Sequence, residues 1–549
     1  MDKYLLTLWR FLPSGNVKQN EIADLLQLSP KQTARYIQKW STEGWLLFFS
    51  GRGRGNVSTL TWLEQVEAVL EEKLMKIIDE KPIEISSKYL LWDWSADSKL
   101  RLMQKFRSKF GYVHNTNDTL IVPRKNPFLT MHPLEAADAH SANIVATIFN
   151  RLVSVDKNGI ISPELAHSWD IQTNRIRIYL KKDIKFHDGS ILTANDVIHC
   201  FENLRNHSYY QDLWKPVKEF VVVAPLIIDV FFSSACSYFL QLLGSINASI
   251  YKETNNHLHG TGSFYVQENN EQKTILIAFK DYYGERALLD IVEFVQVPKD
   301  FDVVYRSSAL EKDNQTFPVE SDSGFGVVLM NTFRNSAIRK KEVRDYIHYV
   351  ILKYRHEISQ ADARYSANHQ GCLIGHSKTY TIPELKRPHF SEPLILRMIN
   401  YTENTTLWLK NILEKEGIPI EIKWVSFKDT IMKNSNNEEV DLFIHGEIFE
   451  MNQNFSYFSF LQNGYSSLAK IIKRDQSIND QLDMYAQTPF RDWTSLNLKI
   501  EKTLIENSIM IPLYYSKRQI PFSADLMNIK VKHFGYVDFS KLWVRPELE

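Results

Sequence analysis

Residues 163–204 read PELAHSWDIQTNRIRIYLKKDIKFHDGSILTANDVIHCFENL, and this stretch decides the fold. Its opening Pro-Glu-Leu-Ala is expected to form a helical turn. The run RIRIYLK alternates polar and apolar residues, which predicts a half-buried strand. The Asp-Gly pair that follows predicts a tight turn. Thr193 is a suitable helix N-cap, Asp196 can support the first-turn amides, and apolar residues at helical spacing predict a helix to Leu204.

The same stretch resembles a pattern found in the dipeptide/oligopeptide class of solute-binding proteins, known as family 5. That class carries Pro-x-Leu-Ala-x-x-Trp, then Phe-x-Asp-Gly, then Leu-Thr-Ala-x-Asp-Val. The matching residues here are Pro163, Leu165, Ala166, Trp169, Phe186, Asp188, Gly189, Leu192, Thr193, Ala194, Asp196 and Val197. The resemblance implies a two-lobed α/β clamshell of the class II periplasmic-binding-protein type, in which these residues build one lobe and do not touch ligand.

Weaker matches extend this resemblance over about residues 119–549. Gly260-Thr261-Gly262-Ser263-Phe264 is similar to the family's Gly-Thr-Gly-Pro-Tyr, with serine in place of proline. Val327–Asn331 resembles the strand that begins the second lobe, and Ile511–Tyr514 is expected to return to the first. The resemblance therefore implies a first lobe of about 119–322 and 508–549, and a second lobe of about 323–507.

Composition and the N-terminal residues bear on where the chain acts. The 549 residues suggest two to four domains, and 65 basic residues balance 65 acidic ones. The start MDKYLLTLWRFLPSG has no small-residue cleavage site, and no cysteine precedes Cys200 to take a lipid. Three cysteines without a paired spacing fit a reducing compartment. We therefore expect a cytoplasmic chain, and we expect the apolar run 220–232 to be a core strand rather than a membrane span.

The first 62 residues have the pattern of a winged helix-turn-helix. Helices are expected at 2–11, at 21–26 and, after the N-cap Ser29 and a first-turn proline, at 30–43. Two strands flanking a Gly-Arg-rich hairpin loop are expected to follow. A helix of this kind fits the major groove, and arginine on a flexible loop can reach a phosphate or the minor groove.

The first 62 residues carry an excess of positive charge. Residues 1–62 hold eight basic and four acidic residues, a net charge of +4, which leaves −4 for the remainder. Taken singly, the third helix could present an ordinary solvated face and the loop could be a plain hairpin. Together they predict a double-stranded DNA interface made by Lys31, Gln32, Arg35, Gln38, Lys39, Arg52, Arg54 and Asn56.

The next segment joins the two parts. A helix at 64–79 is expected to pack on the winged domain, with a homodimer helix as the alternative. A basic amphipathic helix at 96–110 is expected to be a connecting helix, with an auxiliary phosphate contact as the alternative. We predict a DNA-binding domain at 1–80, linker helices at 81–118, ending in the polar run 114–118, and a ligand-sensing domain at 119–549.

This order of parts resembles the SgrR-type transcriptional regulators. The resemblance implies a DNA-binding N-terminal domain and a C-terminal domain that senses a small solute (a sugar, a sugar phosphate or a peptide) by hinge closure. The alternative is the substrate-binding component of a peptide/nickel-type ABC transporter.

Candidate ligand residues are Asn331, at the end of an expected strand, and His445 and Glu447, which follow the run VDLFI. His445 and Glu447 could face the crevice, with ordinary surface-loop residues as the alternative. The aspartate that holds the peptide amine in peptide-binding relatives has no match here, so peptide binding is in doubt. We find no G-x-S-x-G, H-E-x-x-H or Walker motif, and His257-x-His259 lacks companion ligands. We therefore expect no enzyme, no cofactor, no metal and no membrane association.

Overall fold

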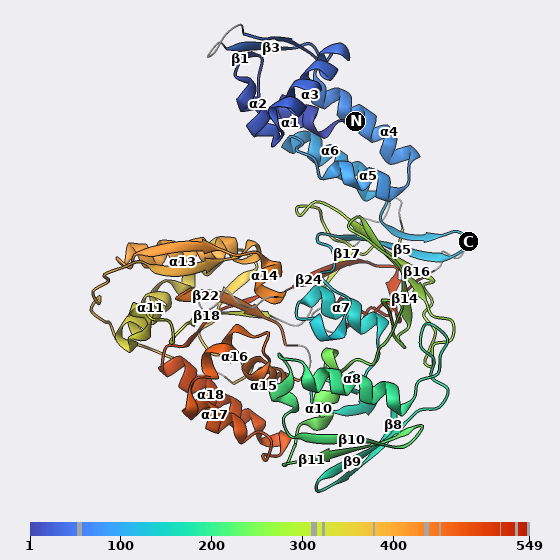
Figure 1. Cartoon of the computed structure of the whole chain (residues 1–549), viewed down its shortest axis with the longest axis vertical. Helices are drawn as coiled ribbons and strands as arrows, with labels where there is room; N and C mark the ends of the chain where they lie inside the picture. The colour runs from blue at the N-terminus through green and yellow to red at the C-terminus, as the bar shows by residue number, and fades with distance from the viewer. Residues whose placement is uncertain are drawn as a thin grey trace.

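The computed structural model describes residues 1–51, 57–308, 316–320, 324–376, 379–432, 439–449, 452–516, 518–532 and 536–545. In Figure 1 an N-terminal domain stands on one end of a two-lobed body. This is the predicted fold class, a winged helix-turn-helix followed by an α/β clamshell.

Among its described residues, the N-terminal domain contains six helices and one small sheet, which lies at the outer end of the domain in Figure 1. Its elements are α1 (Lys3–Phe11), β1 (Gly15–Val17), α2 (Gln19–Leu26), α3 (Pro30–Thr42), β2 (Leu46–Phe49), β3 (Ser58–Trp62), α4 (Val66–Glu80), α5 (Ile83–Leu90) and α6 (Ala96–Arg107). The strands form an antiparallel sheet in the order β1-β3-β2. The sequence did not indicate β1, because three residues are too few to show a period of two.

Helix α3 forms where the residues predict it. Ser29 caps the helix by accepting from the backbone N–H of Gln32 at 3.3 Å, and Pro30 occupies the first turn. Thr33, Ile37 and Trp40 are buried against the domain core. The opposite face of the helix is therefore turned to solvent.

The assignment of residues 81–118 to a linker between domains is corrected by the structure. Residues 81–118 contain α5 and α6, and both helices pack with α4 in the same apolar core as the winged-helix elements. The polar run 114–118 is the turn of a hairpin between β4 (Gly111–His114) and β5 (Asp118–Arg124), not a boundary between domains. A polar run looks alike in a hairpin turn and in a linker, so composition alone could not separate them.

Lobe I is built on two sheets, ordered β14-β15-β16-β5-β4 and β10-β11-β9-β8. Its elements are α7 (Ala139–Ile148), β6 (Val153–Val155), β7 (Ile161–Pro163), β8 (Ala166–Gln172), β9 (Arg175–Leu180), α8 (Ala194–Asn206), α9 (Gln211–Trp214), β10 (Val217–Ala224), β11 (Ile227–Phe232), α10 (Phe239–Leu243), β12 (Lys252–Thr254), β13 (His257–His259), β14 (Phe264–Asn269), β15 (Lys273–Ala278), β16 (Ile291–Gln296) and β17 (Thr316–Glu320).

The prediction for residues 163–204 has one wrong element, and it missed strand β8. Strand β9, the turn at Asp188-Gly189 and the capping box of Thr193 and Asp196 at the start of α8 are as predicted. The expected helical turn at Pro-Glu-Leu-Ala is wrong, because this segment joins β7 to β8. Its backbone N–H groups at Glu164 and Leu165 bond to carbonyls of residues 151–152, which replaces a helical pattern. The run 220–232, expected as one core strand, is a hairpin of β10 and β11.

Lobe II has a six-stranded sheet in the order β19-β23-β18-β22-β20-β21. Its elements are β18 (Gly324–Met330), α11 (Lys341–Tyr354), α12 (Ile358–Ala361), β19 (Tyr365–Ala367), β20 (Leu394–Met398), α13 (Glu403–Lys415), β21 (Ile420–Trp424), α14 (Phe427–Met432), β22 (Leu442–Glu447), α15 (Gln453–Gln462), α16 (Ser467–Ile472), α17 (Gln476–Asp483), α18 (Trp493–Glu506) and β23 (Met510–Ser516). Every residue of β18 is buried, because helices cover both faces of the sheet.

The lobe boundary near residue 508 is a second correction. Strand β23 was expected to return to the first lobe, but it pairs with β18 and β19 inside the lobe II sheet. The return occurs at β24 (Gln519–Ser523), which pairs with β17. The short strands β25 (Leu526–Met527), β26 (Val531–Lys532), β27 (Tyr536–Val537) and β28 (Trp543–Val544) follow. A buried apolar strand carries no mark of the sheet it joins, so its lobe could not be predicted.

The two lobes also touch through α15–α18. Tyr238 of lobe I contacts Phe458 and Trp493, with ring centroids 5.1 and 5.6 Å apart. Lys473 forms an ion pair with Asp212 at 2.6 Å. The side of the clamshell that faces α10 is therefore closed by buried aromatic rings. Among the described residues, no helix has the length and apolar character needed to cross a membrane.

Candidate DNA-binding and ligand-binding sites

Helix α3 presents the predicted reader residues on one face. Lys31, Gln32, Arg35, Gln38 and Lys39 are all exposed. Within the described part of the chain, Lys31 and Arg35 show no ion pair. Gln32 is partly engaged, because its side-chain oxygen accepts from the Ser29 backbone N–H at 3.1 Å in the capping box.

Lys39 has a second role inside the domain. Its Nζ lies 3.0 Å from Oδ2 of Asp2, and the same oxygen accepts from Nε1 of Trp40 at 3.0 Å. Asp2 is also the N-cap of α1. Burial raises the pKa of Asp2, but the hydrogen bonds from Trp40 and Lys39 outweigh it and lower the pKa. Asp2 therefore ties α1 to α3 and partly neutralises Lys39.

Replacing Asp2 with Asn should lower the stability of the N-terminal domain by about 1 kcal/mol at pH 7, because asparagine keeps the cap but loses the charge-assisted bonds. A carboxyl group whose pKa is lower in the folded state stabilises the fold above its unfolded pKa and loses that effect as pH falls through the folded pKa. The difference from the original chain should therefore shrink below about pH 4. Thermal melts between pH 3 and 7 measure this. Asp24→Asn, a change at an exposed carboxyl of α2, is the matched control; equal effects of the two variants would contradict the assignment.

Arg52, Arg54 and Asn56 lie outside the described residues. The strands that flank them are those predicted, β2 ending at Phe49 and β3 beginning at Ser58. Their part in a DNA interface stays a prediction.

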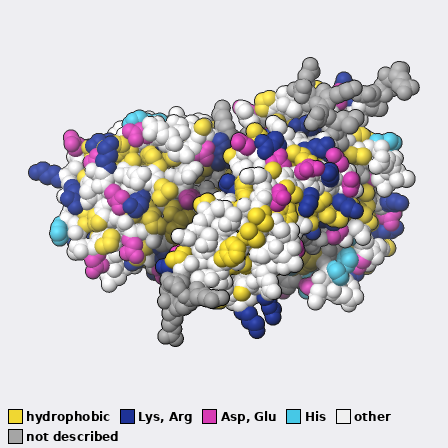
Figure 2. Space-filling model, turned by 90° about the horizontal axis from the view of Figure 1, so that it is seen from above, with side chains coloured by type: hydrophobic (Ala, Val, Ile, Leu, Met, Phe, Trp, Pro, Cys, Tyr) yellow, Lys and Arg dark blue, Asp and Glu magenta, His cyan; other side chains and the backbone are white. Residues whose placement is uncertain are grey.

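The basic residues of α6 form ion pairs with carboxylates. Arg101 pairs with Glu71 at 2.6 Å and Lys105 with Asp79 at 2.7 Å, both on α4. Lys99 and Arg107 pair with carboxylates that follow β16. Helix α6 is therefore packed within the N-terminal domain, and the alternative of an auxiliary phosphate contact loses its support. In Figure 2 basic and acidic side chains are mixed across the visible face.

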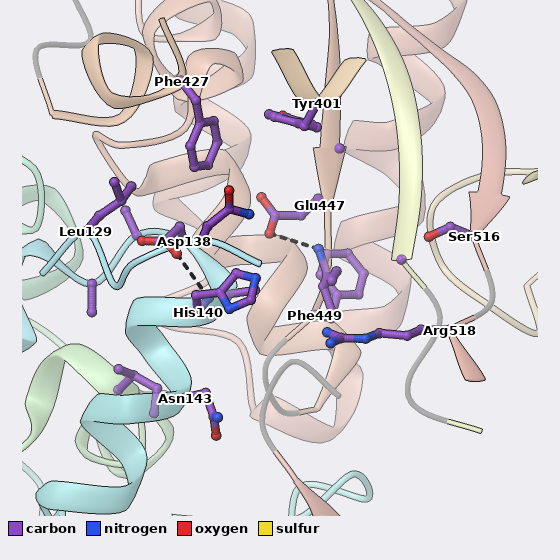
Figure 3. Close-up of a pocket in the computed structure, with 18 of the residues that line it drawn as sticks. Leu129, Asp138, His140, Asn143, Tyr401, Phe427, Glu447, Phe449, Ser516 and Arg518 are labelled. Atoms are coloured by element: carbon purple, nitrogen blue, oxygen red, sulfur yellow. Dashed lines mark hydrogen bonds between the residues drawn. The ribbon is translucent and has the colours of Figure 1, made fainter. Parts of the chain in front are cut away.

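A cavity of about 1880 Å³ lies between the lobes. Lobe I contributes the start of α7, and lobe II contributes the end of β22 and the segment around Tyr401 and Phe427. In Figure 3 Asp138 and His140 face Glu447 across this space, and the side chain of Arg518 points toward His140. Burial lowers the pKa of His140, and Arg518 adds to that shift while Asp138 opposes it. The imidazole is therefore neutral at pH 7.

Two of the three predicted ligand residues line this cavity. His445 and Glu447 lie at the end of β22, and Nε2 of His445 is 3.2 Å from Oε2 of Glu447. Asn331 does not line the cavity, so its prediction as a ligand residue is corrected. It follows the opposite end of β18, where its Nδ2 donates to the Val440 carbonyl at 3.2 Å. Its polar position at a strand end suggested a cleft residue, but that end of the strand faces away from the cavity.

The sequence missed most of the cavity wall. Asp138 is the N-cap of α7, accepting from the backbone N–H groups of His140 and Ser141. An Asx cap before a helix was the only local signal, and it looks the same at any helix start. Arg397 is 2% exposed, and its guanidinium lies 4.0 Å from the centre of the Phe443 ring. Burial lowers the pKa of Arg397 to about 10, so the wall holds a buried cation at pH 7.

Comparison with known protein families matches the N-terminal domain and the clamshell separately. Residues 4–112 match the family model described as "Sugar transport-related sRNA regulator N-term". Residues 161–315 match "Bacterial extracellular solute-binding proteins, family 5 Middle". The ABC transporter-associated periplasmic binding protein DppA of Helicobacter pylori, solved in complex with the peptide STSA, aligns over 78% of this chain and 98% of its own, with a TM-score of 0.63 and 17% identity. The murein tripeptide binding protein MppA of Escherichia coli aligns over 78% and 99%, with a TM-score of 0.65 and 12% identity.

The fold and these matches define a class: a winged helix-turn-helix domain joined to a family 5 solute-binding fold. Relatives that align with the whole chain narrow this class. The "HTH-type transcriptional regulator SgrR" of Photorhabdus laumondii is 25% identical over 549 residues, covering 96% of this chain and 95% of its own. The protein of the same name from Yersinia enterocolitica is 24% identical, covering 100% and 99%. The chain is thus similar over its full length to the SgrR-type transcriptional regulators, as the sequence predicts.

Proposed function

We propose that this chain is a cytoplasmic transcriptional regulator. The N-terminal domain binds double-stranded DNA through α3, and the clamshell binds a small metabolite that alters DNA binding. The observation that carries the proposal is the position of α3: Lys31 and Arg35 are exposed on a capped helix in a winged-helix domain. Similarity to named HTH-type regulators over the full length supports it.

The lining of the cavity supports an anionic metabolite. Its charged residues other than histidine are Arg124, Lys125, Lys299, Arg364, Arg397, Lys428 and Arg518 against Asp138, Asp302 and Glu447. Arg364 pairs with Asp362 and Asp302 pairs with Arg107, so the excess of positive charge remains after these pairs are set aside. Guanidinium groups in the wall can form charge-assisted hydrogen bonds with an anionic ligand. Among a sugar, a sugar phosphate and a peptide, we therefore propose the sugar phosphate.

The DNA-binding part is tested by selecting duplexes from a random library with the full chain and measuring affinity by gel shift. We expect a selected duplex to bind specifically, with affinity falling steeply as salt rises. A chain that retains no duplex at moderate salt would contradict a regulator and favour a binding component of a transporter.

The ligand-binding part is tested by thermal unfolding of the full chain with glucose 6-phosphate, glucose, inorganic phosphate and a dipeptide as probes. A specific ligand at about 100 times its Kd stabilises the folded chain by about 2.7 kcal/mol. We expect glucose 6-phosphate to raise Tm and glucose to leave it unchanged. Arg518→Gln should reduce the shift, while Arg545→Gln, at an exposed arginine outside the cavity, should not. A rise with glucose or the dipeptide alone would contradict the anionic ligand.

A further inference from the structure

The residues after β16 form a short segment, Pro298–Arg306, that touches the N-terminal domain. Phe301 is 1% exposed and packs in the N-terminal core. Its ring centroid lies 6.2 Å from that of Phe106 and 5.3 Å from that of Phe110. A side chain of the clamshell is therefore part of the apolar core of the other domain.

Two ion pairs flank this aromatic contact. Nζ of Lys99 lies 2.8 Å from Oδ2 of Asp300, and Arg107 pairs with Asp302. Both basic residues belong to α6, which packs against α4 in the winged-helix core. The segment is thus held on α6 at three consecutive positions.

The other side of the same segment faces the cavity and the connection between the lobes. The residues of the segment that line the cavity are Lys299, Asp302, Val303, Val304 and Tyr305. Tyr305 stacks on Phe522 of β24, with ring centroids 4.9 Å apart and an interplanar angle of 18°. Its backbone N–H donates to the Pro521 carbonyl at 3.0 Å, and its carbonyl accepts from Ser523 at 2.9 Å. Strand β24 is where the chain returns from the lobe II sheet, and its partner β17 precedes the entry to that sheet.

The far end of the segment is attached to β4, the edge strand of the lobe I sheet that follows α6. The backbone N–H of Tyr112, just after α6, donates to the Arg306 carbonyl at 3.0 Å. Gly111 has φ +125, and a Cβ atom there would lie 2.6 Å from the Ser308 carbonyl oxygen. The backbones approach so closely that only glycine fits.

We propose that Pro298–Arg306 is the segment through which the ligand cavity and the DNA-reading domain influence each other. This rests on the proposed function. Each residue from Asp300 to Asp302 contacts the N-terminal domain, and Tyr305 is bonded to the strand that joins the lobes. A closely packed segment of this length cannot absorb a hinge displacement without moving one of its two neighbours. Because coupling is reciprocal, DNA bound at α3 must also change the strands between the lobes.

The experiment uses this reciprocity, so it needs no known ligand. A duplex selected by the full chain is added, and amide hydrogen exchange is followed in peptides that cover 298–306, β17 and β24. We expect exchange in β17 and β24 to change by about fivefold or more, the lower range of typical coupling. Phe301→Ala should abolish this response while the duplex still binds.

A charge exchange gives the matched control. Lys99→Asp should weaken the response, because it places two carboxylates together, and the double variant Lys99→Asp/Asp300→Lys should restore it. These two variants change only partly exposed side chains, so they test the proposal even if Phe301→Ala does not fold. A duplex that binds but leaves β17 and β24 unchanged, or a response that survives Lys99→Asp at full size, would overturn the segment's role alone. Absence of any bound duplex would overturn the regulator and this role together.

Discussion

Neutralising Lys31 and Arg35 together (Lys31→Gln/Arg35→Gln) should lower the affinity for a selected duplex on the order of 100-fold, because each side chain that binds a base or phosphate contributes about 1–3 kcal/mol. Both side chains are exposed on α3 and take no part in an ion pair among the described residues. The slope of log affinity against log salt should also become shallower, by about 0.9 for each phosphate that the variant no longer neutralises. Fluorescence anisotropy at several salt concentrations measures both quantities.

The matched control removes two charges elsewhere on the same domain. Lys76 of α4 pairs with Glu72 at 2.8 Å, and Lys105 of α6 pairs with Asp79 at 2.7 Å. The variant Lys76→Gln/Lys105→Gln should keep near-normal affinity and an unchanged melting temperature, because exposed pairs of this kind contribute about 0–1 kcal/mol. If both double variants lost affinity equally, binding would depend on net charge and α3 would not be the reader.

The local elements could be predicted because each is determined by residues close together in the chain. The Thr193 and Asp196 capping box, the alternation in β9 and the proline at the start of α3 all act within one turn or one strand. The resemblance over 163–204 then indicated the two-lobed architecture. Whether each of these segments forms a helix or a strand could therefore be predicted from the sequence.

Pairings between distant residues could not be predicted in the same way. Strand β23 joins the lobe II sheet, and β1 joins β3, through backbone hydrogen bonds that any extended segment can make. The cavity depends on such pairings, because Asp138 and Glu447 come together only when lobe II is placed against α7. His445 and Glu447 were found because they end a buried strand. Arg397, within a buried strand, had no comparable signal.

Replacing Trp493 with Ala should lower the stability of the folded chain by about 3–5 kcal/mol, the usual cost of removing a large aromatic side chain from a core, and should weaken the contact between the lobes. Trp493 is fully buried at the start of α18. Its ring centroid lies 4.9 Å from that of Phe458, 4.7 Å from Tyr485 and 5.6 Å from Tyr238 of lobe I. Without it, the side of the clamshell closed by aromatic rings should open. The measurements are chemical denaturation, and small-angle X-ray scattering, in which the radius of gyration should increase.

Trp424 offers a control with the same change of side chain. It ends β21 and is 55% exposed, so Trp424→Ala should leave both the unfolding midpoint and the radius of gyration nearly unchanged. Opening the lobes at α18 should also change the position of strands β17 and β24, which connect the lobes. If Pro298–Arg306 couples these strands to the N-terminal domain, Trp493→Ala should shift duplex affinity at a distance from α3, whereas Trp424→Ala should not. A Trp493→Ala chain that is as stable and compact as the original would show that the aromatic contact does not hold the lobes together.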